Sequence, residues 1–95
     1  NLTISEVTGT SQTLSSANYS TYFYITNSGF NALTLPASTA TSDGGKYWVL
    51  RNATNGYLSI TLTNNLNLTS PITIAPTNSL TLAISGVSAN TILQF

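Results

Sequence analysis

The chain has 95 residues and only four charged side chains, those of Glu6, Asp43, Lys46 and Arg51, and it contains no histidine, cysteine or methionine. Catalytic triads and Cys/His nucleophile pairs need the missing residue types, calcium sites need several clustered carboxylates, and nucleic-acid binding needs a basic surface. The composition therefore argues against an enzyme, a cofactor or metal site and a nucleic-acid partner, and it favours a protein that binds or assembles.

Small polar residues dominate the composition: threonine, serine and asparagine number 17, 13 and 11, while apolar types make up 41%. Disordered segments usually combine low hydrophobicity with high net charge, whereas the net charge here is zero and the mean hydropathy is +0.15. We therefore predict one folded domain over residues 1–95, with residues 1–12 either part of it or a linker or shaft continuation. No apolar run approaches the ~18 residues of a membrane span, so no membrane insertion is expected.

A domain of this size buries only about 60% of the surface of its unfolded chain, so its stability is marginal. Disulfides and zinc, which often brace small domains, are not available to a chain without cysteine or histidine. Oligomerisation is the remaining source of stability, and we expect an assembled protein.

Apolar and polar residues alternate with a period of two through the chain, and no segment has the 3.6-residue spacing of an amphipathic helix. The first such segment, Leu2–Val7, is expected to be an edge strand or a linker. Tyr19–Thr26 is the clearest strand, with Tyr22 and Tyr24 on the face opposite Phe23.

The middle of the chain predicts two more strands around a loop. Phe30–Leu35 is a strand that Pro36 ends, because proline cannot donate to a ladder. Small residues then form a loop over Ala37–Gly45. Lys46–Asn52 is expected to be a central strand whose Trp48 is buried in the core.

Asn55-Gly56 is the strongest hairpin signal in the chain. We therefore expect strands 46–52 and 57–63 to pair antiparallel across it. Further on, Pro71 and Pro76 enclose a short segment that is expected to lie at a sheet edge.

Alternating segments at Leu80–Ile84 and Thr91–Phe95 bring the total to about seven to nine short strands, a pattern typical of sandwiches and barrels. Three Leu-Thr-Leu or Ile-Thr-Ile triads look repetitive, but their separations of 39 and 8 residues give no fixed period. The prediction is an all-β fold, a compact antiparallel β-sandwich or barrel, rather than a β-solenoid.

Five residues are candidates for a binding site. Tyr22, Tyr24 and Tyr47 are amphipathic rings beside hydroxyl and amide groups, which both glycan platforms and subunit interfaces use. Arg51 shares a strand face with Tyr47, where it can stack on a tyrosine or pair with a carboxylate of a neighbouring subunit. Asp43 lies in the glycine-rich turn before the same strand. Interpretations without a binding role remain open: Asp43 can simply stabilise the turn, and Arg51 can be a solvated charge on its strand.

Two loops are the other candidates, Ser38–Gly44 and Ser85–Asn90. Loops vary more freely than strands and often carry binding residues.

The stretch from Tyr22 to Asn52, YFYITNSGFNALTLPASTATSDGGKYWVLRN, resembles the distal modules of trimeric virus and bacteriophage fibres. It contains an aromatic strand, an LTLP strand, a small-residue loop with glycine and a K-aromatic-x-V-x-x-N strand, and Leu58–Leu62 supplies the L-x-I-x-L strand that follows. The resemblance implies a homotrimeric head or tip domain on the virion surface. Such a domain attaches the virion to a host-cell receptor, which is a glycan or a surface protein.

Two other functions remain open at this point. One is a monomeric carbohydrate-binding or adhesion module of a secreted microbial protein, for which Tyr22, Tyr24 or Tyr47 should line an exposed platform within one chain. The other is a purely structural module of a fibre or a capsid decoration that has no receptor of its own.

Overall fold

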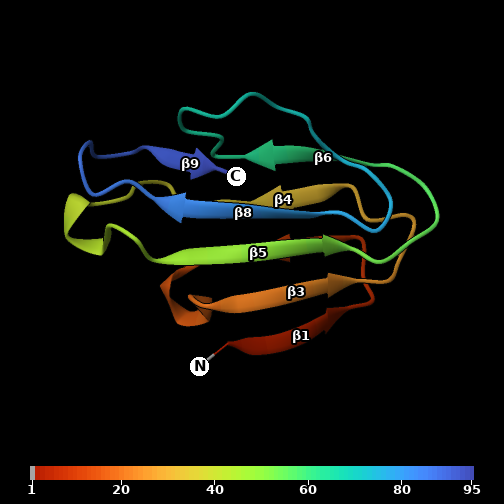
Figure 1. Cartoon of the computed structure of the whole chain (residues 1–95). Helices are drawn as coiled ribbons and strands as arrows, with labels where there is room; N and C mark the ends of the chain where they lie inside the picture. Colours follow the sequence, from red (N-terminus) through yellow and green to blue (C-terminus); the bar gives the residue numbers. More distant parts are fainter. Residues whose placement is uncertain (1) are drawn as a thin grey trace.

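The alternating segments form strands that assort into two sheets (Figure 1), in a computed structural model that describes residues 2–95. In chain order the elements of this range are β1 (Thr3–Val7), β2 (Ser11–Thr13), η1 (Ser16–Asn18), β3 (Thr21–Ile25), β4 (Ala32–Thr34), η2 (Thr41–Asp43), β5 (Tyr47–Asn52), β6 (Leu58–Thr63), β7 (Ile72–Ile74), β8 (Ser79–Ile84) and β9 (Ile92–Gln94). The all-β prediction is confirmed, and the nine strands lie within the expected number. The two η elements are single turns of 3-10 helix.

The chain changes sheet with every strand from β1 to β6. One sheet has the order β1-β3-β5-β8-β9 and the other the order β2-β4-β6-β7. A chain that returns to a sheet after a full coil runs in the same direction each time, so β1, β3 and β5 are parallel, as are β2, β4 and β6. The expectation of an antiparallel fold is therefore wrong for this half of the molecule.

This winding resembles that of a β-solenoid, although its coils differ in length. Thr3 pairs with Thr21, 18 positions later, and Thr21 pairs with Trp48, 27 positions later. The missing sequence period, which argued against a solenoid, excludes only coils of equal length.

Antiparallel strands end the winding at the C-terminal side. β7 pairs with β6, β8 with β5, and β9 with β8, all antiparallel. The segment between Pro71 and Pro76 lies at a sheet edge as predicted, since β7 is the last strand of its sheet. At the other end β1 is also an edge strand, in register with β3 over five residue pairs.

The predicted hairpin between β5 and β6 is wrong, because the two strands belong to different sheets. Asn52 explains the difference. Its fully buried side chain donates from Nδ2 to Gly56 O at 2.8 Å and Ile74 O at 2.9 Å, while its Oδ1 accepts from Thr54 N at 3.0 Å and Thr54 Oγ1 at 2.6 Å. These bonds hold residues 52–56 as a crossing to the other sheet.

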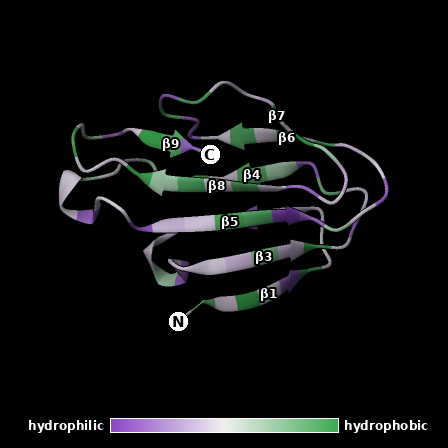
Figure 2. Cartoon of the chain, viewed as in Figure 1, coloured by the Kyte–Doolittle hydropathy of each residue, from purple (hydrophilic) through white to green (hydrophobic). Residues whose placement is uncertain are grey.

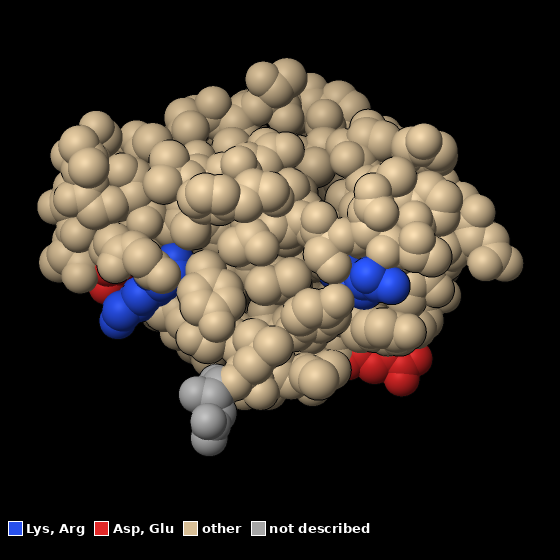
Figure 3. Space-filling view, in the orientation of Figure 1, with Lys and Arg blue, Asp and Glu red and all other residues tan. Residues whose placement is uncertain are grey.

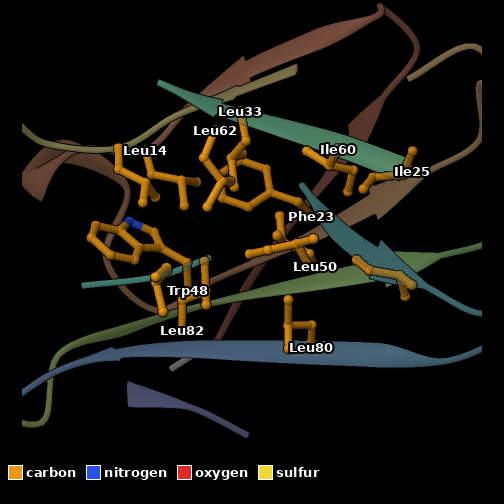
Figure 4. Packing of buried hydrophobic residues seen from close by; sticks show 14 of the residues in the cluster. Leu14, Phe23, Ile25, Leu33, Trp48, Leu50, Ile60, Leu62, Leu80 and Leu82 are labelled. Atoms are coloured by element: carbon orange, nitrogen blue, oxygen red, sulfur yellow. The ribbon is translucent and has the colours of Figure 1, made fainter. Parts of the chain in front are cut away.

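The residues that point inward from both sheets form one hydrophobic cluster (Figure 4). Its members are Val7, Leu14, Phe23, Ile25, Phe30, Leu33, Leu35, Trp48, Leu50, Leu58, Ile60, Leu62, Leu68, Ile72, Ile74, Leu80, Leu82, Ile84 and Ile92. The expected burial of Trp48 is confirmed, and its Nε1 donates to Asn18 Oδ1 at 2.8 Å and to Ser15 O at 3.1 Å. Residues 2–95 include no helix that is long and apolar enough to cross a membrane.

The side chain of Asn52 is expected to contribute strongly to stability. Asn52→Ala removes four hydrogen bonds from a dry site, and at ~1 kcal/mol net for each bond the free energy of unfolding should fall by about 2–4 kcal/mol. Urea unfolding followed by the fluorescence of Trp48, the single tryptophan, measures this change. Asn55→Ala is the control: this side chain is exposed, so the change should stay within about 0.5 kcal/mol. Equal effects of the two substitutions would contradict the assigned role.

Candidate functional site

The outward face of the five-stranded sheet, here called the sheet face, brings together residues from all five strands. Cross-strand register places them in three rows, namely Ile4, Tyr22, Val49, Thr81 and Phe95; Glu6, Tyr24, Arg51 and Ser79; and Tyr47, Ala83 and Leu93. Phe95 joins its row through two backbone hydrogen bonds with Thr81, of 3.2 and 2.9 Å. Four of the five candidate residues, Tyr22, Tyr24, Tyr47 and Arg51, therefore share one surface.

Exposed apolar side chains concentrate on this face. Five of the seven large ones in the described chain lie there, counting Leu2 just before β1; the five are Leu2, Ile4, Tyr24, Leu93 and Phe95. Ile4 and Phe95 stand at opposite edges of the sheet and are each 72% exposed. Between them in the row stand Tyr22, Val49 and Thr81, all half-buried, so the row is apolar apart from the hydroxyl groups of Tyr22 and Thr81.

The outward face of the other sheet differs in chemistry. Its outward residues are Ser11, Thr13, Ala32, Thr34, Ser59, Thr61, Thr63 and Thr73, so all but one carry a hydroxyl group. Figure 2 shows hydrophobic and hydrophilic bands alternating along strands such as β1 and β8, as expected where a sheet has two different faces. One outward surface of the molecule is thus suited to water and the other is largely apolar.

Charge on the sheet face lies in a single row near one end of the strands. Glu6 and Arg51 flank Tyr24 in one row, and Glu6 Oε2 accepts a hydrogen bond from Thr26 Oγ1 at 3.0 Å. Figure 3 shows the two basic side chains separated by uncharged surface. Within residues 2–95 the one ion pair joins Asp43 to Lys46 at 3.7 Å, away from this row.

The two candidate loops lie against each other at one end of the molecule, here called the loop end (residues 38–44 and 85–90). Thr39 N donates to Asn90 Oδ1 at 2.9 Å and Asn90 N donates to Thr39 O at 3.0 Å. Gly44 packs directly on Gly86. Val87, at the tip, is 90% exposed. The sequence reasoning selected these loops separately, and the fold makes them one surface.

Asp43 belongs to the loop end, so the fold does not bring it together with the other four candidates. Lys46 links Asp43 to an aromatic stack, because its Nζ lies 5.4 Å from the centroid of the Tyr19 ring, which in turn lies 5.2 Å from that of Trp48. Stacking on a tyrosine was one of the roles considered for Arg51; within residues 2–95 it is Lys46 that lies over a tyrosine ring. Partial burial, followed by the charge of Asp43, raises the pKa of Tyr19.

Sequence reasoning missed Ile4 and Phe95 as members of the exposed face. A signal was present in β1, where Ile4 and Glu6 are two residues apart and therefore lie on the same face of the strand. A charged side chain is expected to point to water, so this spacing assigns Ile4 to the outward face as well.

Residues 2–95 contain no detected pocket and no group of three or more histidine, cysteine, aspartate or glutamate residues that could hold a metal ion. The candidate binding surfaces in this range, the sheet face and the loop end, are both open ones. Comparisons with protein-family models, curated proteins and solved structures found no match.

The close approach of Gly44 and Gly86 should make the loop end sensitive to one methyl group. In Gly44→Ala the new Cβ would overlap Gly86 Cα and lie 2.8 Å from Gly86 N, so backbone must move. We expect a loss of about 1–3 kcal/mol in the free energy of unfolding, as for other overpacked sites. Gly56→Ala is the matched control, since its Cβ would meet nothing within 4 Å. If urea unfolding shows equal losses, the two loops do not pack as described.

Tyr19 should give the stability a pH dependence at high pH. Its pKa is raised above the ordinary value of 10.0, so below about pH 10 it is protonated in both folded and unfolded chains and pH has no effect through it. Above that value the unfolded chain releases the proton first, and the free energy of unfolding falls as pH rises through the folded pKa. Urea midpoints measured from about pH 9 to 11.5 should fall less in Tyr19→Phe than in the parent. An unchanged slope would show that Tyr19 is not responsible.

Proposed function

We propose that the chain is a non-enzymatic attachment domain, a β-sandwich head at the outer end of a homotrimeric virus or bacteriophage fibre, which binds a host-cell receptor. The observation that carries the proposal is the gathering of exposed apolar and aromatic side chains on the sheet face. Monomeric soluble proteins rarely leave a large contiguous apolar patch open, and such patches usually mark interaction sites. An exposed apolar and aromatic face as the main surface feature therefore supports a function in binding.

Three further features support an assembled attachment domain. The chain resembles fibre modules from Tyr22 to Asn52. Its net charge is zero, so copies of the chain do not repel one another, and it has no cysteine for a stabilising disulfide. The loop end offers a second open surface on the same molecule. One surface can therefore serve assembly while the other contacts a receptor.

The carbohydrate-binding module is the second candidate, and one observation favours it. Tyr22, Tyr24 and Tyr47 lie on one face within a single chain, as a glycan platform requires. Tyr24 is 43% exposed, whereas Tyr22 and Tyr47 are half-buried, and Tyr22 Oη lies 3.3 Å from Ser79 Oγ.

Cell binding and glycan binding separate these functions. The folded domain should bind saturably to cells of a susceptible host, and Val87→Asp at the loop end should weaken that binding by at least about tenfold, or ~1.4 kcal/mol. Sedimentation should give the mass of a trimer. A glycan array should show hits that Tyr24→Ala removes if the carbohydrate-binding module is correct. A folded protein that binds no cell in a broad panel and no glycan would contradict both proposals and favour the structural module.

A further inference from the structure

The sheet face has one chemistry and the opposite face of the molecule has another, although both are made of alternating strands. We propose that the sheet face packs against a second copy of this chain, which leaves receptor binding to the loop end. The assignment of receptor binding to the loop end rests on the proposed function. The self-contact itself follows from the residues of the face.

The mixture of side chains fits a protein surface better than a sugar. Sugars stack on aromatic rings, but the exposed outward positions at the two edges of the sheet include the aliphatic Ile4, Leu2 and Leu93 beside the aromatic Phe95. The rings of Tyr22 and Tyr47 stand between them and are half-buried. Aromatic and aliphatic groups at the centre of a patch with charge at its margin are typical of protein interfaces.

The charges on the face complement a second copy. Glu6 and Arg51 lie in one row with Tyr24 between them, and two strand spacings of ~4.8 Å separate their backbones by about 10 Å. Neither forms an ion pair within residues 2–95. Each copy thus offers one acid and one base, so in a trimer whose sheet faces turn toward the common axis, Glu6 of one copy can lie near Arg51 of the next.

The size of the face is sufficient for a stable contact. The Cα atoms of the chain extend over 37 × 29 × 19 Å, and Figure 1 looks onto the broad side, where the five-stranded sheet lies. A standard interface needs about 800 Å² from each partner, which this side can supply. The loop end lies beyond the strand ends, at the start of β5, and stays open when the sheet face is covered.

Lysine substitutions test the contact. Ile4→Lys and Phe95→Lys place a charge in the proposed interface and should raise the Kd for self-association at least about 30-fold, or ~2 kcal/mol. Tyr57→Lys is the matched control, because Tyr57 is also 72% exposed but lies outside the sheet face. Thr61→Lys provides a second control on the hydroxyl-rich face. Sedimentation velocity gives the association, and Trp48 fluorescence and urea midpoints verify that each variant is folded.

A charge exchange tests the pairing between copies. Arg51→Glu should weaken association about tenfold, and the double variant Glu6→Arg/Arg51→Glu should restore it, because the acid and the base are both present again. A double variant as weak as the single one would overturn the pairing. Equal effects of Tyr57→Lys and Phe95→Lys, or a parent protein that stays monomeric at its highest soluble concentration, would overturn the interface.

The two proposals fail in different ways. If the parent assembles through the sheet face but binds no cell or glycan, the proposed function is wrong and the inference stands. If the parent binds cells as a monomer and Phe95→Lys abolishes that binding, the inference is wrong and the attachment function stands. Under both proposals together, Phe95→Lys gives a folded monomer that retains contact with the receptor through the loop end.

Discussion

Every connection among the first six strands crosses from one sheet to the other, and the rest of the structure depends on how the backbone of these crossings is satisfied. A crossing cannot use the ladder of either sheet, and an unpaired buried amide or carbonyl costs about 1–3 kcal/mol. Asparagine side chains supply the missing partners. Asn27, in the crossing from β3 to β4, donates to Thr8 O of the crossing from β1 to β2 at 3.0 Å and accepts from Gly29 N at 2.7 Å, which ties the crossings of neighbouring coils together. Asn52 does the same inside the crossing from β5 to β6.

This use of amides gives the composition a structural meaning. Asn67 pairs with Ile92 through two hydrogen bonds, from Ile92 N at 2.7 Å and to Ile92 O at 3.0 Å, and so takes the place of a neighbouring strand. Asn18 orients the Trp48 indole and caps the turn before β3. An asparagine amide carries two N–H donors and a carbonyl acceptor on separate atoms, whereas a hydroxyl has its one donor and its acceptors on a single atom and a carboxylate only accepts. A chain braced in this way needs few charges to define its turns.

The sequence predicted which face of each strand is buried far better than it predicted which strands pair. Alternation depends on the local backbone alone, so the burial of Phe23 and Trp48 and the outward position of Tyr24 followed directly. Strand pairing depends on contacts between residues far apart in the chain. The dipeptide Asn55-Gly56 is compatible with a crossing between sheets as well as with a hairpin, so it does not decide between them. The candidate site divides in the same way. Its strand residues share a face, whereas the grouping of Asp43 with the other loop required the fold.

The scarcity of charge links the two faces of the molecule. Soluble proteins usually resist association through mixed charges over their surfaces and through lysine and other charges on their edge strands. The hydroxyl groups of the four-stranded sheet keep that face hydrated without charge, but over the row from Ile4 to Phe95 the five-stranded sheet has no charge and only the hydroxyl groups of Tyr22 and Thr81. A face that was meant to stay in water would gain solubility from a single lysine at Val49 or Thr81, and neither position has one. The lack of charge over this face therefore supports the proposal that a second copy of the chain covers it.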